Sequence, residues 1–196
     1  MTFNKQVHVD RIRTVGLSDA QEIYGPPSPE ADGLITRDRG LALIVFTADC
    51  IPLLLHDPVA GAIGAIHSGW RSTALDIGPK AVKRMCAEFG SRPEDIQAAI
   101  GPAIDKCCFE TGEDVRQAML AVMGAGADLF IAPKGGGKYM TDLKGIVRSR
   151  LISAGLKAEN ISVSPLCTLC RRDLFWSHRA QGDARGSMAS FIALKD

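Results

Sequence analysis

The sequence carries little excess charge of either sign and no long hydrophobic run. Lys and Arg number 23 against 22 Asp and Glu, a formal net charge of +1. The chain therefore lacks the broad positive field with which nucleic-acid-binding proteins neutralise phosphates. No apolar run reaches the roughly 18 residues that suggest a membrane span, and the opening residues lack the apolar segment of a secretory signal. We expect no nucleic-acid or membrane partner and a cytoplasmic location.

Several signatures of nucleotide and metal enzymes are also missing. The glycine-rich residues 133–138 lack the G-x-x-x-x-G-K-[ST] order of a P-loop and are predicted to form a mobile surface loop. The H-x-E and P-C-x-x-C elements of nucleobase zinc deaminases do not occur. The four histidines are too few for the many imidazoles of a multicopper cluster. These absences disfavour a P-loop enzyme, a deaminase of that type and a multicopper oxidase.

Length and composition are those of one globular domain. With 196 residues and 46% hydrophobic side chains, the chain can bury one substantial core, so we expect a single domain over residues 1–196. The chain is large for a disulfide scaffold, so its six cysteines are expected to be reduced thiols. We expect a monomer or a small homo-oligomer.

The apolar pattern predicts an irregular order of strands and helices. Three apolar runs are predicted to be buried strands of one sheet: residues 41–46, 51–56 and 62–67. Further strands are predicted at 96–100, 161–164 and 187–194, helices at 113–122 and 143–154, and a surface loop at 21–33. Ser72 or Thr73 is predicted to cap a helix that ends near Gly90, which puts a helix start close behind His67. This order predicts the α+β class, with a layered mixed β-sheet and flanking helices.

Cys50 and His67 both stand at ends of predicted strands, where a rigid sheet can aim two side chains at one point. Thiolate and imidazole are zinc ligands, and three protein ligands with an open fourth position are typical of catalytic zinc. The residues alone leave two alternatives open. The pair can be a buried apolar cysteine with an ordinary hydrogen-bonded histidine, or the nucleophile and base of a cysteine hydrolase.

Three further polar residues can support such a site. Asp49 can accept a ring N–H from a ligand histidine and fix its tautomer, or it can cap a turn. Arg71, near the predicted helix start, can hold a phosphate or form a surface salt bridge. His178 can contribute a proton or contact substrate, or it can be a polar residue at a strand edge.

Cys167 and Cys170 have the spacing of a zinc knuckle, which needs a second pair of ligands to close. Cys107 and Cys108 are adjacent, and neighbouring side chains on a strand point to opposite faces. We therefore do not expect a structural zinc at these cysteines.

Six motifs occur in order over nearly the whole chain and together resemble the laccase-domain family, also called the multicopper polyphenol oxidase or purine nucleoside phosphorylase family. They are QVH at residues 6–8, ADGLIT at 31–36, TADCIPLLL at 47–55, AIHSGWRS at 65–72, IGPAI and CCFETG between 100 and 112, and LCT followed by FWSHR between 166 and 179.

The resemblance implies a fold shared with bacterial toxin cysteine hydrolases and a metal site made of His8, Cys50 and His67. It implies phosphorolysis of adenosine, inosine and methylthioadenosine with inorganic phosphate as co-substrate, together with adenosine deaminase activity. We take zinc as the metal. Catalysis is assigned to Cys50, His67, His8 and Asp49, and substrate binding to Arg71, His178 and Arg179. The alternatives are a copper-dependent polyphenol oxidase, a cysteine hydrolase and an inactive nucleoside-binding relative.

The sequence departs from the family pattern in three places. It begins almost at QVH, so it is expected to lack the usual N-terminal segment with its Arg-His-Gly-Gly. The usual GWRG is GWRS, which is expected to add the Ser72 side chain where the backbone approaches substrate. The usual YEVG is FETG at residues 109–112.

Overall fold

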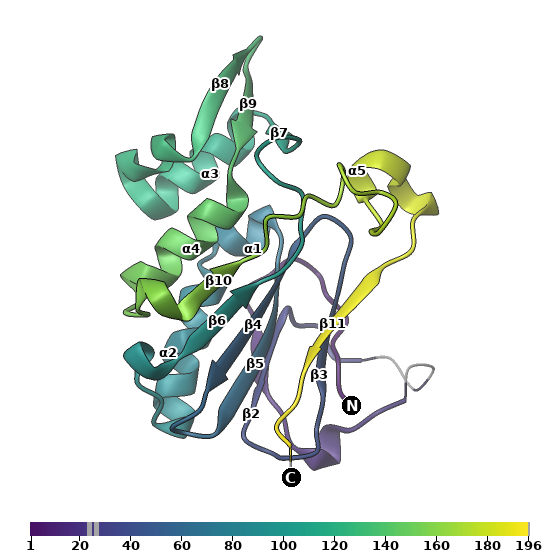
Figure 1. Ribbon diagram of the computed structural model, residues 1–196, viewed down its shortest axis with the longest axis vertical. Helices are drawn as coiled ribbons and strands as arrows, with labels where there is room; N and C mark the ends of the chain where they lie inside the picture. The colour runs from purple at the N-terminus through teal and green to yellow at the C-terminus, as the bar shows by residue number, and fades with distance from the viewer. Residues whose placement is uncertain (23–24, 26–27, 196) are drawn as a thin grey trace.

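A mixed sheet runs through the middle of the computed structural model, which describes residues 1–22, 25 and 28–195 (Figure 1). Within those residues the sheet has six strands in the order β1-β2-β5-β4-β6-β10. The strands are β1 (Ile12–Thr14), β2 (Gly33–Thr36), β4 (Ile51–Asp57), β5 (Ala62–Ser68), β6 (Gln97–Ile100) and β10 (Ile161–Val163). The outer pairs β1–β2 and β6–β10 are parallel, and the central pairs are antiparallel. The mixed sheet confirms the predicted class.

The hairpin β4–β5 forms the centre of the sheet, and every residue of β5 is buried. Its turn follows from the sequence: Asp57 accepts backbone N–H bonds from Val59 (2.9 Å) and Ala60 (3.0 Å), and Gly61 takes a positive φ of 62°. Because layers cover both faces of β5, its sequence is a nearly continuous apolar run instead of an alternating one.

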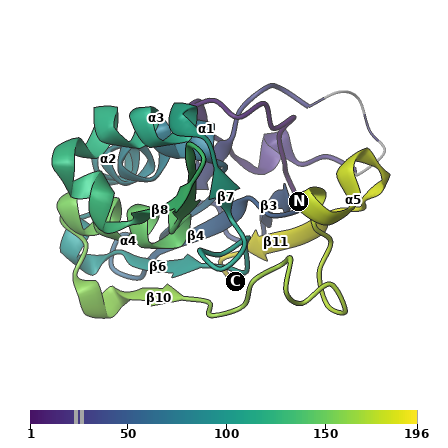
Figure 2. The same cartoon turned by 90° about the horizontal axis from the view of Figure 1, so that it is seen from above.

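A second, two-stranded sheet covers one face. It pairs β3 (Leu43–Thr47) with β11 (Met188–Ile192) in antiparallel order. Figures 1 and 2 show this pair on the side of the central sheet opposite the helices. The prediction that residues 41–46, 51–56 and 62–67 share one sheet is therefore wrong for the first run. A short apolar run shows that a strand is buried, but not in which layer it pairs.

Helices cover the other face. They are α1 (Trp70–Ala74), α2 (Ile77–Phe89), α3 (Glu113–Met123) and α4 (Leu143–Ser153), with α5 (His178–Gln181) near the C-terminus. Short 3-10 helices lie at Leu17–Asp19, Pro93–Asp95, Gly124–Leu129, Ala158–Asn160 and Gly182–Ala184. Residue Asp76, not Ser72 or Thr73, stands at the start of α2, and its carboxylate pairs with Arg150 of α4 at 2.8 and 2.6 Å. The predicted cap is wrong because the two hydroxyls lie inside α1 and bond their own backbone.

A small three-stranded sheet joins β7 (Glu110–Thr111), β9 (Lys138–Thr141) and β8 (Ile131–Gly135). The predicted mobile loop at residues 133–138 instead forms the end of the β8–β9 hairpin, with the turn at residues 136–137. Gly135, Gly136 and Gly137 have φ of 101°, 57° and 70°, so the glycine run serves the turn. Of the predicted loop at 21–33, residues 23–24 and 26–27 lie outside the described residues, and Gly33 already belongs to β2.

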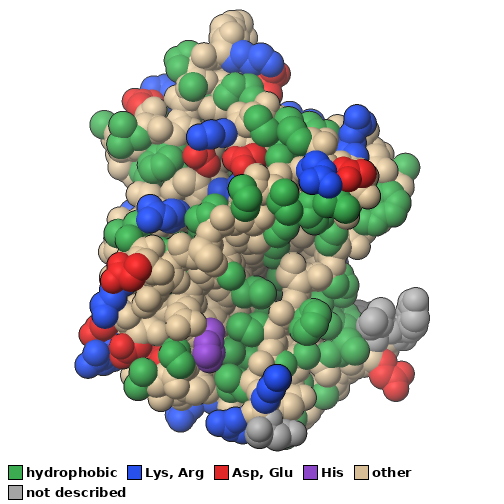
Figure 3. Space-filling model, in the orientation of Figure 1, with side chains coloured by type: hydrophobic (Ala, Val, Ile, Leu, Met, Phe, Trp, Pro, Cys, Tyr) green, Lys and Arg blue, Asp and Glu red, His purple; other side chains and the backbone are tan. Residues whose placement is uncertain are grey.

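Acidic and basic side chains are interspersed over the face seen in Figure 3, without a large area of one sign. Among the described residues, no helix is both long enough and apolar enough to span a bilayer.

The core supplies a test of the fold. Leu53 of β4 is fully buried in the main apolar cluster, so Leu53→Ala leaves a cavity there. We expect a loss of about 2–5 kcal/mol in the free energy of unfolding, measured by urea denaturation. Leu129→Ala is the matched control, because Leu129 is 85% exposed and its truncation is expected to change stability by no more than about 0.5 kcal/mol. Equal losses in the two variants would contradict the assigned packing.

Candidate metal centre

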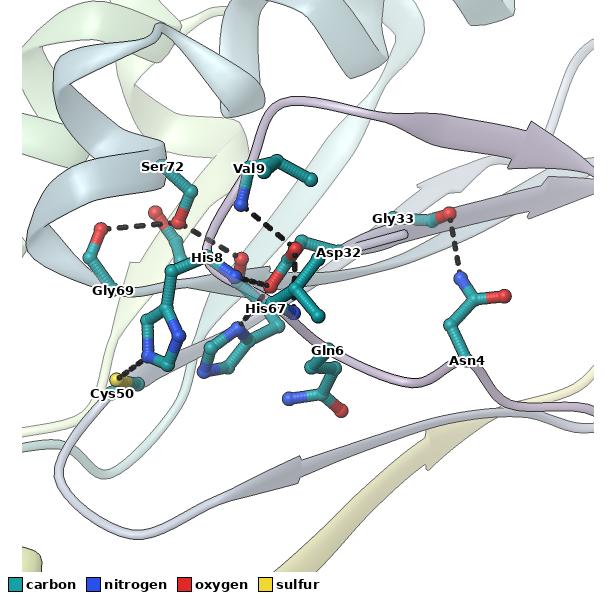
Figure 4. A network of polar contacts seen from close by, with 12 residues as sticks. Asn4, Gln6, His8, Val9, Asp32, Gly33, Cys50, His67, Gly69 and Ser72 are labelled. Carbon is teal, nitrogen blue, oxygen red and sulfur yellow. Dashed lines mark hydrogen bonds and ion pairs between the residues drawn. The ribbon is translucent and has the colours of Figure 1, made fainter. Parts of the chain in front are cut away.

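His8, Cys50 and His67 converge at one end of the β4–β5 hairpin (Figure 4). Cys50 directly precedes β4, and His67 is the last residue but one of β5, where it is paired with Pro52. His8 comes from the segment before β1. One potential ligand atom from each residue lies within 4.8 Å of the other two, and Cys50 Sγ is 3.7 Å from His8 Nε2. The structure thus brings the three predicted ligands together.

A single buried carboxylate, that of Asp32, positions both histidines. Asp32 Oδ1 lies 2.7 Å from His67 Nδ1. The same carboxylate accepts backbone N–H bonds from Val7 (3.1 Å), His8 (3.0 Å) and Val9 (2.9 Å). These bonds hold residues 7–9 in a turn in which His8 has a φ of 61°, a left-handed conformation that is uncommon for a non-glycine residue. Asp32 therefore fixes the His67 ring and the backbone of His8 at once.

Asp49 does not have the predicted role of orienting a histidine. Its carboxylate accepts bonds from Thr168 Oγ1 (2.6 Å), Ser177 Oγ (3.0 Å) and the backbone N–H of Arg179 (2.7 Å). Asp49 is buried and has a φ of 84°. It is next to Cys50 in sequence, but it fastens the C-terminal segment 168–179 to the end of β3. The histidine-orienting carboxylate is Asp32, which the sequence offered only as part of the ADGLIT motif.

Charge within the site is strongly coupled. Burial alone lowers the pKa of His67, but the Asp32 carboxylate and the Cys50 thiolate outweigh it and raise that pKa to about 9. Burial likewise raises the pKa of Cys50, whereas the two histidines bring it down to about 6. Burial also raises the pKa of Asp32, and its hydrogen bonds to His67, Val9 and Val7 reverse this and hold it below the usual value. The favoured proton arrangement is therefore a Cys50 thiolate beside a His67 imidazolium. A metal cation can replace the proton that these two side chains share.

Two neighbouring residues, Gly69 and Gln6, make room for the ligands and hold them in place. A Cβ on Gly69 would lie 2.8 Å from His8 Cδ2 and 3.1 Å from Cys50 Sγ, so the glycine of HSGW leaves room for both ligands. Gln6, the first residue of QVH, exchanges two side-chain bonds with the backbone of Phe46 (2.7 and 2.8 Å). This pairing anchors the N-terminal segment to β3 and carries His8 to the hairpin.

A pocket of about 230 Å³ opens beside the three ligands. Its lining residues are Asn4, Gln6, His8, Phe46, Thr47, Ala48, Cys50, His67, Arg185 and Ser187. Arg185 contributes a guanidinium to this lining, although it is absent from the predicted site residues. No sequence motif distinguishes it among the 23 Lys and Arg of the chain.

The predicted substrate-binding residues Arg71, His178 and Arg179 are not among the residues that line this pocket. The Arg71 guanidinium lies 4.3 Å from the centre of the Trp70 ring, and Arg71 is not among the lining residues. His178 Nδ1 accepts a bond from Arg185 Nε at 3.3 Å. Arg179 Nη2 donates to the Glu110 carbonyl at 2.9 Å. The structure thus connects His178 to the pocket through Arg185, whereas Arg179 holds the β7 region.

Comparison with known proteins identifies the family. Residues 1–195 match the family described as multi-copper polyphenol oxidoreductase laccase. The chain belongs to this family. It is 37% identical over 198 residues to the purine nucleoside phosphorylase YlmD of Bacillus subtilis, covering 99% of this chain and 70% of that protein. A match of 38% over 151 residues to the adenosine deaminase RL5 of an unknown prokaryotic organism covers 77% of this chain and 57% of the relative.

Solved structures support the same assignment. The crystal structure of the Bacillus licheniformis hypothetical protein YfiH superposes with a TM-score of 0.95 at 38% identity. The superposition covers 99% of this chain and 74% of that protein. The laccase-domain resemblance drawn from the motifs is therefore confirmed, and so is the α+β fold.

Two departures from the laccase-family motifs, GWRS and FETG, place hydroxyl side chains that bond within the fold. Ser72, the last residue of GWRS, is fully buried, and its hydroxyl bonds the carbonyls of His67 (3.3 Å) and Gly69 (3.2 Å). The expectation that this side chain faces substrate is wrong, because it turns into the helix backbone. Thr111 of FETG bonds Thr141 in the small sheet at 2.7 Å.

The donor set suits zinc. Two imidazoles and one thiolate are borderline-soft ligands, and three protein ligands leave a fourth position for a catalytic role. The Asp32–His67 bond puts the ring proton on Nδ1 and leaves Nε2 to bind, as carboxylates behind zinc-bound histidines commonly do. His8, Cys50 and His67 would hold the ion.

Replacing the orienting carboxylate tests this arrangement. Asp32→Asn removes the charge that accepts from His67 and from three backbone N–H groups. We expect zinc affinity to fall by about 10–100-fold, measured by competition with a chromophoric chelator. Asp173→Asn is the control, because Asp173 bonds only the exposed Arg171 among the described side chains. Unchanged zinc affinity in folded Asp32→Asn protein would contradict the assignment.

The assignment of Asp49 has its own test. Asn keeps the size of Asp and tolerates positive φ, so Asp49→Asn removes little except the carboxylate. We expect the free energy of unfolding to fall by roughly 1–3 kcal/mol and amide hydrogen exchange over residues 168–179 to become faster. Zinc affinity should not change. Asp114→Asn, on the exposed surface of α3, is the control. If Asp49→Asn instead lowered zinc affinity as Asp32→Asn does, the histidine-orienting role expected of Asp49 would be restored.

Proposed function

We propose that this protein is a purine nucleoside phosphorylase that cleaves inosine, adenosine and methylthioadenosine with inorganic phosphate. The observation that carries the proposal is the pocket in which Asp32 holds His67 beside Cys50 and His8. It occurs in a chain that is 37% identical, over 99% of its length, to a protein named purine nucleoside phosphorylase.

The reaction needs a nucleophile held against the sugar and a site for anionic charge. A phosphate oxygen forms a bond to C1′ of the ribose, and the N-glycosidic bond breaks. The purine leaves with the bonding electron pair and takes up a proton, which gives free base and the sugar 1-phosphate. Positioning the two reactants is a large part of such catalysis.

Arg185 is the cation best placed to bind phosphate. It lines the pocket together with Cys50 and His67, and a guanidinium binds phosphate oxygens in a bidentate manner. Its bonds to His178 Nδ1 (3.3 Å) and Ser187 Oγ (3.0 Å) orient it. We therefore assign phosphate binding to Arg185 in place of Arg71, and we assign His178 to substrate binding through Arg185.

We assign positioning roles to Asp49 and Arg179. Asp49 bonds Ser177 Oγ and the Arg179 backbone, which precede and follow His178 directly. A carboxylate that is buried with three donors holds its partners firmly. Through it, His178, which bonds Arg185 of the pocket lining, keeps its place relative to Cys50.

A zinc ion bound by His8, Cys50 and His67 would supply a Lewis acid that activates an oxygen nucleophile near neutral pH. The chain's own residues set the conditions for it. Asp32 fixes the His67 tautomer, and His67 and His8 keep Cys50 in the thiolate form. A cytoplasmic location, where thiols stay reduced, suits a site that depends on that thiolate.

Adenosine deamination is proposed for the same pocket. Water in place of phosphate attacks C6 of adenine, ammonia leaves, and inosine is formed. Support comes from the relative named adenosine deaminase, which is 38% identical over 151 residues. One pocket that activates either phosphate or water accounts for both reactions.

A cysteine hydrolase is the second candidate, and one observation favours it. The Cys50 pKa of about 6 and the neighbouring His67 form a thiolate–imidazolium pair of the kind that nucleophilic cysteines use. A hydrolase of this kind would act without phosphate, so the phosphate dependence of product release separates it from the phosphorylase.

The decisive assay measures hypoxanthine released from inosine in the presence of phosphate. We expect phosphate-dependent release by the wild-type protein and none above background for Cys50→Ala. Cys86→Ala, which changes a cysteine of α2 away from the site, should keep the activity. Equal release by wild type and Cys50→Ala would overturn the proposal. Stoichiometric copper together with copper-dependent phenol oxidation would instead establish a polyphenol oxidase. Nucleoside binding without turnover would establish an inactive relative.

A further inference from the structure

A second group of metal-type ligands lies outside the proposed active site. Cys107, Cys108, Cys167 and Cys170 have sulfur atoms that all lie within 4.8 Å of one another. Cys170 Sγ is 3.4 Å from Cys108 Sγ and 3.6 Å from Cys107 Sγ. The two pairs are about sixty residues apart in sequence, so the fold and not the local chain brings them together.

Cys107 and Cys108 are not on a strand, so the expectation that their side chains diverge is wrong. They lie in a turn in which the N–H groups of Cys108 and Phe109 both donate to the Asp105 carbonyl at 2.8 Å. Alternation of side chains between two faces holds on strands and not in such a turn. Both thiols can therefore face Cys170.

We propose that these four cysteines bind a structural zinc ion. Tetrahedral zinc with Zn–S bonds of about 2.3 Å places its sulfur ligands about 3.8 Å apart, close to the separations seen here. Four thiolates fill the coordination shell and leave no open position, which distinguishes this site from the one at His8, Cys50 and His67. The Cys167–Cys170 spacing supplies the knuckle, and the turn supplies the second pair.

Surrounding bonds preorganise the cluster. The Asp105 N–H donates to Cys167 Sγ at 3.4 Å, an interaction that orients a thiolate ligand. Lys144, 3% exposed, pairs with Asp105 Oδ2 at 2.6 Å and bonds the carbonyls of Ser164 (2.8 Å) and Leu166 (3.3 Å). Lys144 thus fixes the turn and the segment after β10 to each other.

The zinc ion would fasten the segment that Asp49 also holds. Thr168, between Cys167 and Cys170 in sequence, donates its hydroxyl to Asp49 at 2.6 Å. From there the chain continues to Ser177 and Arg179, the other partners of Asp49. The ion would join the turn that holds Cys107 and Cys108 to this C-terminal segment, and this role does not depend on which reaction the protein catalyses.

The metal content of the full-length protein, purified without chelator, tests the proposal. We expect about two zinc ions per chain. His8→Ala combined with His67→Ala should lose one and keep the other. Cys170→Ser should lose the second ion, and Cys86→Ser, a thiol change on α2 outside the cluster, should lose none. With cobalt in place of zinc, the His8→Ala/His67→Ala protein should show the intense thiolate-to-metal absorption of a tetrathiolate centre.

The double histidine variant decides the outcome even if Cys170→Ser does not fold, because it retains all four cysteines. One zinc ion per chain with the tetrathiolate spectrum supports the proposal. Absence of metal from this folded variant overturns it. A disulfide from Cys170 to Cys107 or Cys108 in freshly purified protein, found by mass spectrometry of peptides, overturns it as well, since the bonded sulfurs could not bind zinc as thiolates.

Discussion

The hydrogen bonding of one buried carboxylate organises the functional end of this molecule. Asp32 is 1% exposed, and burying an unpaired charge there would be prohibitive. Three backbone N–H groups of residues 7–9 and the His67 ring satisfy it. Removing one partner of such a buried charge typically costs about 3–5 kcal/mol. The same bonds that make the carboxylate tolerable therefore force His8 and His67 to the same place.

The rest of the site depends on the sheet. Antiparallel pairing of β4 with β5 sets Pro52 opposite His67. Strand pairing alone therefore brings Cys50 to the same end of the hairpin as His67. Gly69 keeps the space between Cys50 and His8 free of a side chain. On the far side of Cys50, Asp49 binds the C-terminal segment, and Arg185 of that segment completes the pocket. Residues from both ends of the chain thus surround one thiolate.

Sequence patterns predicted the strands and the main helices, because apolar periodicity is a local signal. They also indicated Cys50 and His67 as candidate site residues, because both stand at ends of predicted strands. They did not place β3 in the second sheet, and they did not predict the hairpin at residues 133–138. The pairing of a strand and the geometry of a turn depend on contacts with distant residues. His8 came only from family resemblance. The roles of Asp32 and Arg185 were not predicted, and a zinc site at the four cysteines was predicted against, because these groups act through residues at least seven positions away, and mostly many more. Asp49 was chosen for its nearness to Cys50, yet its bonds run to residues 168–179.

Anomalous diffraction from crystals of the untreated protein tests the central claim most directly. Data collected on both sides of the zinc absorption edge locate the ion and identify its element at once. We expect a zinc peak bounded by Cys50 Sγ and one ring nitrogen each of His8 and His67, with the Asp32 carboxylate still bonded to His67 Nδ1. A peak that follows the copper edge instead, or a well-ordered site with no metal peak among these three side chains, would contradict it.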